Sequence, residues 1–155
     1  HDFPADWNIL LAIPNLPPGA SGIQEQDIFS RNCPVPIEEV REICHELLMH
    51  MVPGIVEHDL DLFARAVNRV QDLGFKRVEL GLQHRDIPAL LQVMRDAGAA
   101  CAGMSSFGPT LFAIGDSNLH QVNEAVIEYM GPLGGGTTIL TRARNTGASV
   151  RCMGT

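Results

Sequence analysis

The hydrophobic positions of the chain fall into short apolar runs and helical stripes that alternate along its length. Residues 7–13 form a short apolar run that Pro14 stops, a pattern typical of a buried strand. Residues 15–36 change to proline, glycine, serine and polar side chains, which favour neither a strand nor a helix. They predict a long loop, and loops of that length in compact domains are often functional.

Two stretches in the first half have the three- and four-residue spacing of amphipathic helices. The first begins near Pro36, with acidic residues in its first turn, and is expected to end at Pro53-Gly54. The second covers about residues 59–73, with Gly74 as its C-terminal stop. The side chains expected to face the core are Val40, Ile43, Leu47, Leu48 and Met51 in the first helix and Leu62, Phe63, Ala66, Val67 and Val70 in the second.

The second half predicts a hairpin after a third helix. Residues 77–82 alternate weakly, and either a strand or a helical turn fits them. The third helix has Asp86 as its N-cap and ends at Gly98. Two apolar stretches follow, at residues 99–104 and 110–114, and the serine, glycine and proline residues between them indicate a tight turn.

A last helix and a last strand complete the pattern. The helix covers residues 118–130 and is expected to bury Val122, Val126 and Tyr129, and the strand covers residues 137–143. The order of strand, helices, hairpin, helix and strand predicts an α+β fold. With an extra helix in the first crossover it matches the ferredoxin-like split β-α-β sandwich, with an antiparallel sheet and helices on one face.

Composition narrows the class of protein. The 155 residues fit one domain, and 45% hydrophobic residues support a sizeable core. The net charge of −7 argues against non-specific nucleic-acid binding, whereas a small anionic substrate stays compatible because local dipoles can outweigh the global field. No apolar run reaches the ~18 residues of a membrane span, and the sequence does not open with a signal peptide.

The cysteines and the first residue bear on the origin of the chain. Cys33, Cys44, Cys101 and Cys152 are scattered without a Cys-x-x-Cys pair, so neither a zinc site nor a disulfide framework is indicated. Reduced thiols predict a cytoplasmic protein. The sequence opens at His1, close before the first expected strand, which suggests an excised piece of a longer chain.

The turn between the two hairpin strands carries the most specific chemistry. Small residues let a backbone turn approach a ligand closely, and its N–H groups can then cradle phosphate or carboxylate oxygens. Ser105 and Ser106 add hydroxyl donors, while Gly103 and Gly108 would permit the close approach. A glycine-containing hairpin is more often structural, so this feature alone does not establish a ligand site.

Other polar residues could join such a site. Arg31 in the polar loop could form a bidentate pair with a carboxylate or phosphate, and Arg144 and Asn145 beside the last strand could supply further donors. A solvated surface position is the alternative for both arginines. Glu57 and Asp59 could bind Mg²⁺ or move a proton, or Asp59 could simply be the N-cap of the second helix.

Residues 103–113, Gly-Met-Ser-Ser-Phe-Gly-Pro-Thr-Leu-Phe-Ala, resemble the third signature motif of the GHMP superfamily, which includes galactokinase, homoserine kinase and mevalonate kinase. The kinases usually have glycine where Ser106 stands, which argues against a kinase-type nucleotide contact. The Met-Ser-Ser-aromatic-Gly-Pro form resembles instead the β-ribofuranosylaminobenzene 5′-phosphate synthase family. Residues 17–22, 29–36 and 145–148 agree with that family in the expected order.

The resemblance implies that residues 1–155 are a single GHMP C-terminal-like domain, the C-terminal half of a two-domain enzyme whose N-terminal half is absent. Enzymes of that family join phosphoribosyl pyrophosphate to 4-aminobenzoate or 4-hydroxybenzoate, with release of pyrophosphate and carbon dioxide, in tetrahydromethanopterin biosynthesis. The turn residues would bind a phosphate or the departing pyrophosphate, with Mg²⁺ as a candidate cofactor. The isolated chain is expected to be inert.

Two other hypotheses stay open. One is a GHMP-type small-molecule kinase that uses ATP and Mg²⁺. The other is a stand-alone ferredoxin-like module that senses a small ligand and dimerises through its sheet. A free edge strand, where the missing half should dock, would favour self-association as a homodimer.

Overall fold

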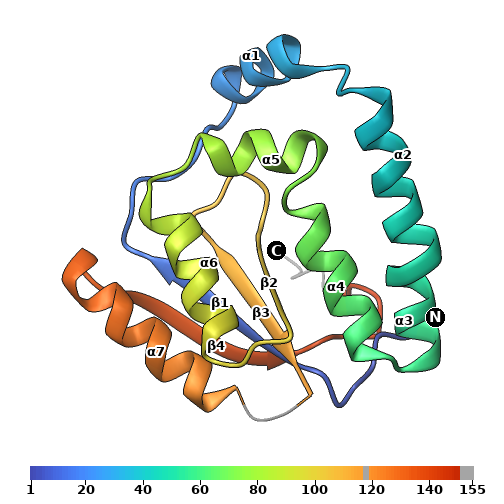
Figure 1. Ribbon diagram of the computed structural model, residues 1–155. Coiled ribbons are helices and arrows are strands. Elements are labelled where there is room, and N and C mark those ends of the chain that lie inside the picture. The colour runs from blue at the N-terminus through green and yellow to red at the C-terminus, as the bar shows by residue number, and fades with distance from the viewer. Residues whose placement is uncertain (117–118, 151–155) are drawn as a thin grey trace, which may run out of the picture.

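The computed structural model describes residues 1–116 and 119–150, and within them a four-stranded sheet forms the centre of the molecule (Figure 1). The strand order is β2-β3-β1-β4, and each neighbouring pair is antiparallel. This arrangement confirms the α+β, ferredoxin-like fold class. The strands lie close to their predicted places: β1 (Asn8–Pro14), β2 (Cys101–Met104), β3 (Leu111–Gly115) and β4 (Gly136–Arg142).

Successive side chains of each strand point to opposite faces of the sheet. Helices α6 (Asp86–Asp96) and α7 (His120–Met130) cover one face (Figure 1), where they share the larger core with Leu10 and Ala102. The alternate positions belong to a second core, in which Phe63 of α4 (Leu60–Val70) packs with Cys101 and Ile114. Among the described residues, no helix is both long and apolar enough to span a bilayer.

Strand β2 lies at one edge of the sheet, and polar side chains occupy its outer side. Asn68 of α4 accepts a hydrogen bond from the Ala102 N–H and donates one to the Ala100 carbonyl, both at 3.1 Å. The buried Gln71 accepts from the Met104 N–H at 3.0 Å. These bonds satisfy groups that a bare edge would leave open to another strand. At the other edge, β4 is exposed along almost its whole length, so β4 is the edge that could accept a partner.

The segment between β1 and α4 contains more helix than predicted. Helix α1 (Ile23–Asn32) lies inside the predicted loop and buries no residue, so no apolar stripe revealed it. The next helix does not end at Pro53-Gly54: α2 (Ile37–His45), the π-helical stretch η1 (Glu46–Met51) and α3 (Val52–Glu57) follow one another directly. Pro53 follows the π-helical turn as the second residue of α3, where a missing N–H is tolerated.

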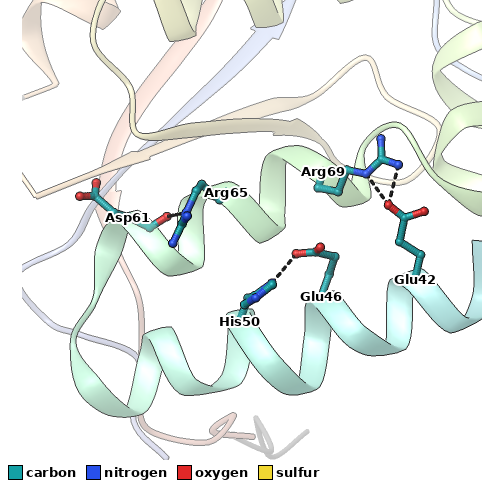
Figure 2. A network of polar contacts seen from close by, with 6 residues as sticks. All are labelled: Glu42, Glu46, His50, Asp61, Arg65 and Arg69. Carbon is teal, nitrogen blue, oxygen red and sulfur yellow. Dashed lines mark hydrogen bonds and ion pairs between the residues drawn. The ribbon is translucent and has the colours of Figure 1, made fainter.

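This long helix contacts α4 through apolar and ionic side chains. The predicted inward position of Leu48 is wrong, because its side chain is 68% exposed, whereas Met51 does pack against the second core. Between the two helices, the Arg69 Nε donates to the Glu42 carboxylate at 2.7 Å (Figure 2). This hydrogen bond raises the pKa of the Arg69 guanidinium. The network holds α2 against α4, the helix whose side chains cover β2.

The predicted caps had different outcomes. Asp59 is the N-cap of α4, which was one of the two roles considered for it. Its Oδ1 accepts a hydrogen bond from a backbone N–H of the first turn at 2.9 Å. Gly74 does not end a helix but begins α5 (Gly74–Gly81), with a φ of +54°. Because α5 extends to Gly81, most of the ambiguous residues 77–82 are helical. Asp86 lies within α6 rather than capping it, and its Oδ1 accepts from the hydroxyl of the half-buried Tyr129 at 3.0 Å. The predicted helix start at residue 118 falls outside the described residues.

Candidate functional site

Residues 105–110, here called the serine turn, connect β2 to β3 and have a defined backbone geometry. The Ser105 N–H donates to the Thr110 carbonyl, and the Gly108 N–H donates to the Ser105 carbonyl, both at 2.9 Å. Ser106 has a φ of +46° and Gly108 a φ of +62°, so the left-handed region is used twice. Both serine side chains are exposed.

The serine turn keeps hydrogen-bond donors available. Within residues 1–116 and 119–150, no acceptor pairs with the backbone N–H of Ser106 or Phe107. The hydroxyls of Ser105 and Ser106 also have no partner in that part of the chain. Adjacent N–H groups around a residue in the left-handed region form a concavity that binds anions. The arrangement can therefore offer two amides and two hydroxyls to a phosphate or carboxylate.

Side chains beneath the serine turn hold its carbonyl groups. The Lys76 ammonium of α5 donates to the carbonyls of Met104 at 3.2 Å and Ser106 at 3.3 Å. The Gln83 side chain donates to the Phe107 carbonyl at 2.9 Å. Sequence analysis missed both residues, although one signal existed: Lys76 is the only lysine among the 155 residues.

Aromatic packing anchors the serine turn to two helices. The Phe107 side chain is buried, and its ring makes an edge contact with Phe75 of α5 at a centroid distance of 5.8 Å. Phe75 stacks in turn on Phe29 of α1 at 4.1 Å. The buried ring fixes the inner side of the turn, so the exposed serines are presented on a rigid base.

The glycines near the serine turn have packing reasons. A Cβ on Gly19, in the loop after β1, would lie 1.7 Å from the Phe107 carbonyl oxygen, so the loop and the turn touch through their backbones. A Cβ on Gly103 would lie 2.5 Å from the Phe112 ring and 2.9 Å from the Gln71 side chain. Gly103 is itself buried in β2, so its predicted role in close approach to a ligand has a structural alternative.

Arg31 lies on α1, the helix that Phe29 joins to the serine turn. Its guanidinium is exposed and pairs with Asp27 one turn earlier on the same helix, at 2.5 Å. An exposed pair of this kind contributes little to stability and can exchange partners readily. Arg31 therefore lies at the same end of the molecule as the serine turn, but its guanidinium is paired with Asp27 and not with the turn.

Arg144 and Asn145 lie at the opposite end of the sheet from the serine turn. In the β1–β4 register Arg142 pairs with Asn8 at the start of β1, while the turn adjoins the other end of β1. Asn145 exchanges two hydrogen bonds of 2.9 Å with the backbone of Phe3, which ties down the N-terminal segment. The Arg144 Nε donates to the Thr146 hydroxyl at 2.9 Å. The structure therefore separates these two candidates from the serines.

Glu57 and Asp59 also lie away from the serine turn. They line a surface cavity of about 490 Å³ together with Ala100 and Asp116, which flank the far ends of β2 and β3. Asp59 is engaged as the cap of α4. In the described part of the chain, no group of three or more His, Cys, Asp or Glu side chains is arranged to hold a metal ion.

Comparison with known proteins bears on both the fold and the turn. Residues 51–131, slightly more than half of the chain, match the family described as GHMP kinases C terminal. A homoserine kinase from Cytophaga hutchinsonii superposes with a TM-score of 0.68, covering 90% of this chain and 42% of the kinase. At 17% identity this likeness concerns the fold alone.

Curated sequences are much more similar. The chain is 44% identical over 148 residues to the β-ribofuranosylphenol 5′-phosphate synthase of Methanothermobacter thermautotrophicus, covering 96% of this chain and 44% of that protein. It is 45% identical over 150 residues to the enzyme of that name from Archaeoglobus fulgidus, covering 96% and 46%. These matches confirm the resemblance that the Met-Ser-Ser-aromatic-Gly-Pro motif indicated. The chain spans a little under half the length of these relatives.

Proposed function

Since the chain belongs to the family of GHMP kinase C-terminal domains, we propose that its serine turn binds the phosphate groups of phosphoribosyl pyrophosphate in an enzyme that transfers the phosphoribosyl group to an aromatic acid. One observation carries this proposal: the turn exposes two serine side chains, and two of its backbone N–H groups have no partner among the described residues. Such donors match the oxygens of a pyrophosphate better than those of a neutral ligand.

The reaction forms one carbon–carbon bond and breaks two bonds. The ring carbon that bears the carboxylate attacks the anomeric carbon of the ribose, and pyrophosphate leaves with the electron pair of the broken carbon–oxygen bond. Loss of carbon dioxide returns an electron pair to the ring and restores its aromaticity. The relatives are named for a ribofuranosylphenol product, so 4-hydroxybenzoate is the acceptor we favour over 4-aminobenzoate.

The serine turn would act on the leaving group. Negative charge builds on pyrophosphate as the anomeric centre becomes oxocarbenium-like, and donors already oriented toward that charge lower the barrier. The turn is suited to this because its inner side is fixed by Phe107 and by the bonds from Lys76 and Gln83. The proposal includes a cleft completed by the other half of a longer protein, a place in tetrahydromethanopterin biosynthesis and a cytoplasmic location. On this view the isolated chain binds but does not turn over.

A GHMP-type kinase is the second candidate, and one observation favours retaining it. Ser106 stands where the kinases usually have glycine, but its φ of +46° is a glycine-like conformation. The departure from the kinase pattern is therefore confined to one added hydroxymethyl side chain, and the backbone path of the turn does not argue against ATP.

Both candidates can be tested on a polypeptide of the relatives' length that carries this chain. Calorimetry should detect phosphoribosyl pyrophosphate binding and no comparable binding of ATP, and carboxyl-labelled 4-hydroxybenzoate should release labelled carbon dioxide. The double variant Ser105→Ala/Ser106→Gly should weaken phosphoribosyl pyrophosphate binding by roughly tenfold or more through the lost hydroxyls. The control Ser149→Ala removes an exposed serine of the C-terminal segment and should leave binding unchanged. Tight ATP binding with phosphate transfer would favour the kinase instead.

A further inference from the structure

The only lysine of the chain lies beneath the serine turn. The other ten basic residues counted as Lys or Arg in the sequence are all arginines. The single lysine at position 76 therefore raises the question of what an ammonium does there that a guanidinium would not. The Lys76 ammonium has three acceptors: the carbonyls of Met104 and Ser106 and the carboxylate of Glu79. An ammonium offers three donors from one nitrogen, whereas a planar guanidinium directs its donors outward from several atoms. The acceptors therefore match lysine and not arginine.

The bonds to the carbonyls determine where the amides of the turn point. In a trans peptide the carbonyl of one residue and the N–H of the next lie in one rigid plane and point in opposite directions. Lys76 binds the Ser106 carbonyl, so the Phe107 N–H of the same plane is directed away from the lysine. The Ser105 carbonyl accepts from Gly108, so the Ser106 N–H is directed away from the inside of the turn in the same manner. The two amides without described partners therefore belong to peptide planes whose carbonyls, those of Ser105 and Ser106, are held internally.

Lys76 is itself held in place. The Glu79 side chain is about nine-tenths buried, and Lys76 is its ion-pair partner one helical turn earlier on α5. A buried carboxylate of this kind requires a compensating charge, which restricts the ammonium to the space under the turn. The Lys76 side chain keeps 20% of its surface exposed, so its positive charge is not fully shielded from a ligand above the turn.

We propose that Lys76 is the positioning residue of the anion site: it holds the Met104 and Ser106 carbonyls inward, so that the Phe107 N–H, joined by the Ser106 N–H, faces a phosphate group. The inference rests on the proposed function, because it assumes that the serine turn binds an anion. It adds the group that orients the donors, and it assigns a role to a residue outside the motif.

The test compares variants of the 155-residue chain in calorimetric titrations with inorganic pyrophosphate. Glu79→Gln is the reference for the double variant, because it removes the buried carboxylate but retains the lysine with its two carbonyl acceptors, and it should still bind pyrophosphate. The double variant Lys76→Met/Glu79→Gln also lacks the buried carboxylate and in addition lacks the lysine. It should bind pyrophosphate at least about tenfold more weakly than Glu79→Gln. Arg77→Met is the matched control, because Arg77 is the next residue of α5 and pairs with Glu39 at the surface. It should stay within about threefold of the wild type.

A measurement on the wild type covers the case in which the double variant does not fold. Protein labelled with ¹⁵N-lysine has a single side-chain signal, and pyrophosphate should shift that signal with the calorimetric Kd. An unmoved signal, or equal affinity in the double variant and in Glu79→Gln, overturns the role of Lys76 while the anion site stands. If the wild type binds no pyrophosphate, the anion site fails, and the role of Lys76 fails with it.

Discussion

Replacing Gly103 with alanine separates a packing role of this glycine from a ligand role. Gly103 lies in the middle of β2, and an added Cβ would be 2.5 Å from the Phe112 ring and 2.9 Å from the Gln71 amide. Real Cβ contacts are longer, so both side chains must move. Gln71 is buried and accepts from the Met104 N–H, so a displaced Gln71 would leave a strand amide without its acceptor.

The magnitude follows from two terms. Overpacking in a tight core costs about 1–3 kcal/mol. A buried donor left without its acceptor costs about 1–3 kcal/mol more. We therefore expect Gly103→Ala to lower the free energy of unfolding by roughly 3 kcal/mol, measured by urea denaturation. For a chain of this size the melting temperature should fall by roughly 6–12 °C.

A matched control and a double-mutant cycle make this result specific. Gly81 lies at the end of α5 with nothing within 4 Å of an added Cβ, so Gly81→Ala should be neutral or stabilising. In a Gln71→Ala background the cost of Gly103→Ala should shrink, because the contact with Gln71 is gone. Unchanged stability of Gly103→Ala together with lost pyrophosphate binding would refute the packing argument and favour close approach of a ligand.

The further predictions concern three side chains. Asn68→Leu leaves the Ala102 N–H at the edge of β2 without its acceptor and should cost about 2–4 kcal/mol in urea unfolding, with faster exchange of that amide; unchanged exchange would contradict the edge-covering role. Burial raises the pKa of the Cys101 thiol to about 12, so iodoacetamide at pH 8 should modify the exposed Cys33 and spare Cys101 until the chain unfolds, as peptide mapping can show. Because the unfolded thiol ionises near pH 8.5 and the folded one does not, this group should lower stability progressively as the pH rises above that value. Ser106→Gly relieves a left-handed residue and should change the free energy of unfolding by between 0 and about +1 kcal/mol, whereas a clear loss of stability in thermal melts would contradict the assigned conformation.

The sequence predicted the sheet better than the N-terminal helices, for a physical reason. Strands such as β1 and the hairpin are buried on one or both faces, so they have continuous apolar runs between turn residues. Helix α1 buries no residue, and its Phe29 stays 41% exposed although it stacks on Phe75, so no buried apolar stripe marks this helix in the sequence. Pro53 was a misleading stop signal because a π-helical stretch precedes it, in which the Val52 N–H bonds to the carbonyl of Leu47, five residues earlier. This wider hydrogen-bond spacing lets the helix continue past the proline, which has no N–H of its own.

The candidate site was predictable only in part. The serine turn could be identified because small residues and turn formers between two apolar runs have a local signature. Which distant residues join it depends on the strand register, and the register puts Arg144 and Asn145 at the other end of the sheet. Lys76 lies in a stretch that the pattern left ambiguous, and its three acceptors come from α5 and the hairpin, so only the folded chain brings them together.

The most direct test of the account is an amide NMR titration of the chain with inorganic pyrophosphate. The signals of the Ser106 and Phe107 N–H groups should move downfield by more than those of Ser105 and Gly108, whose N–H groups already donate inside the turn. Larger shifts near Asn145, or no difference between the two pairs of amides at saturation, would show that the serine turn does not hold the anion.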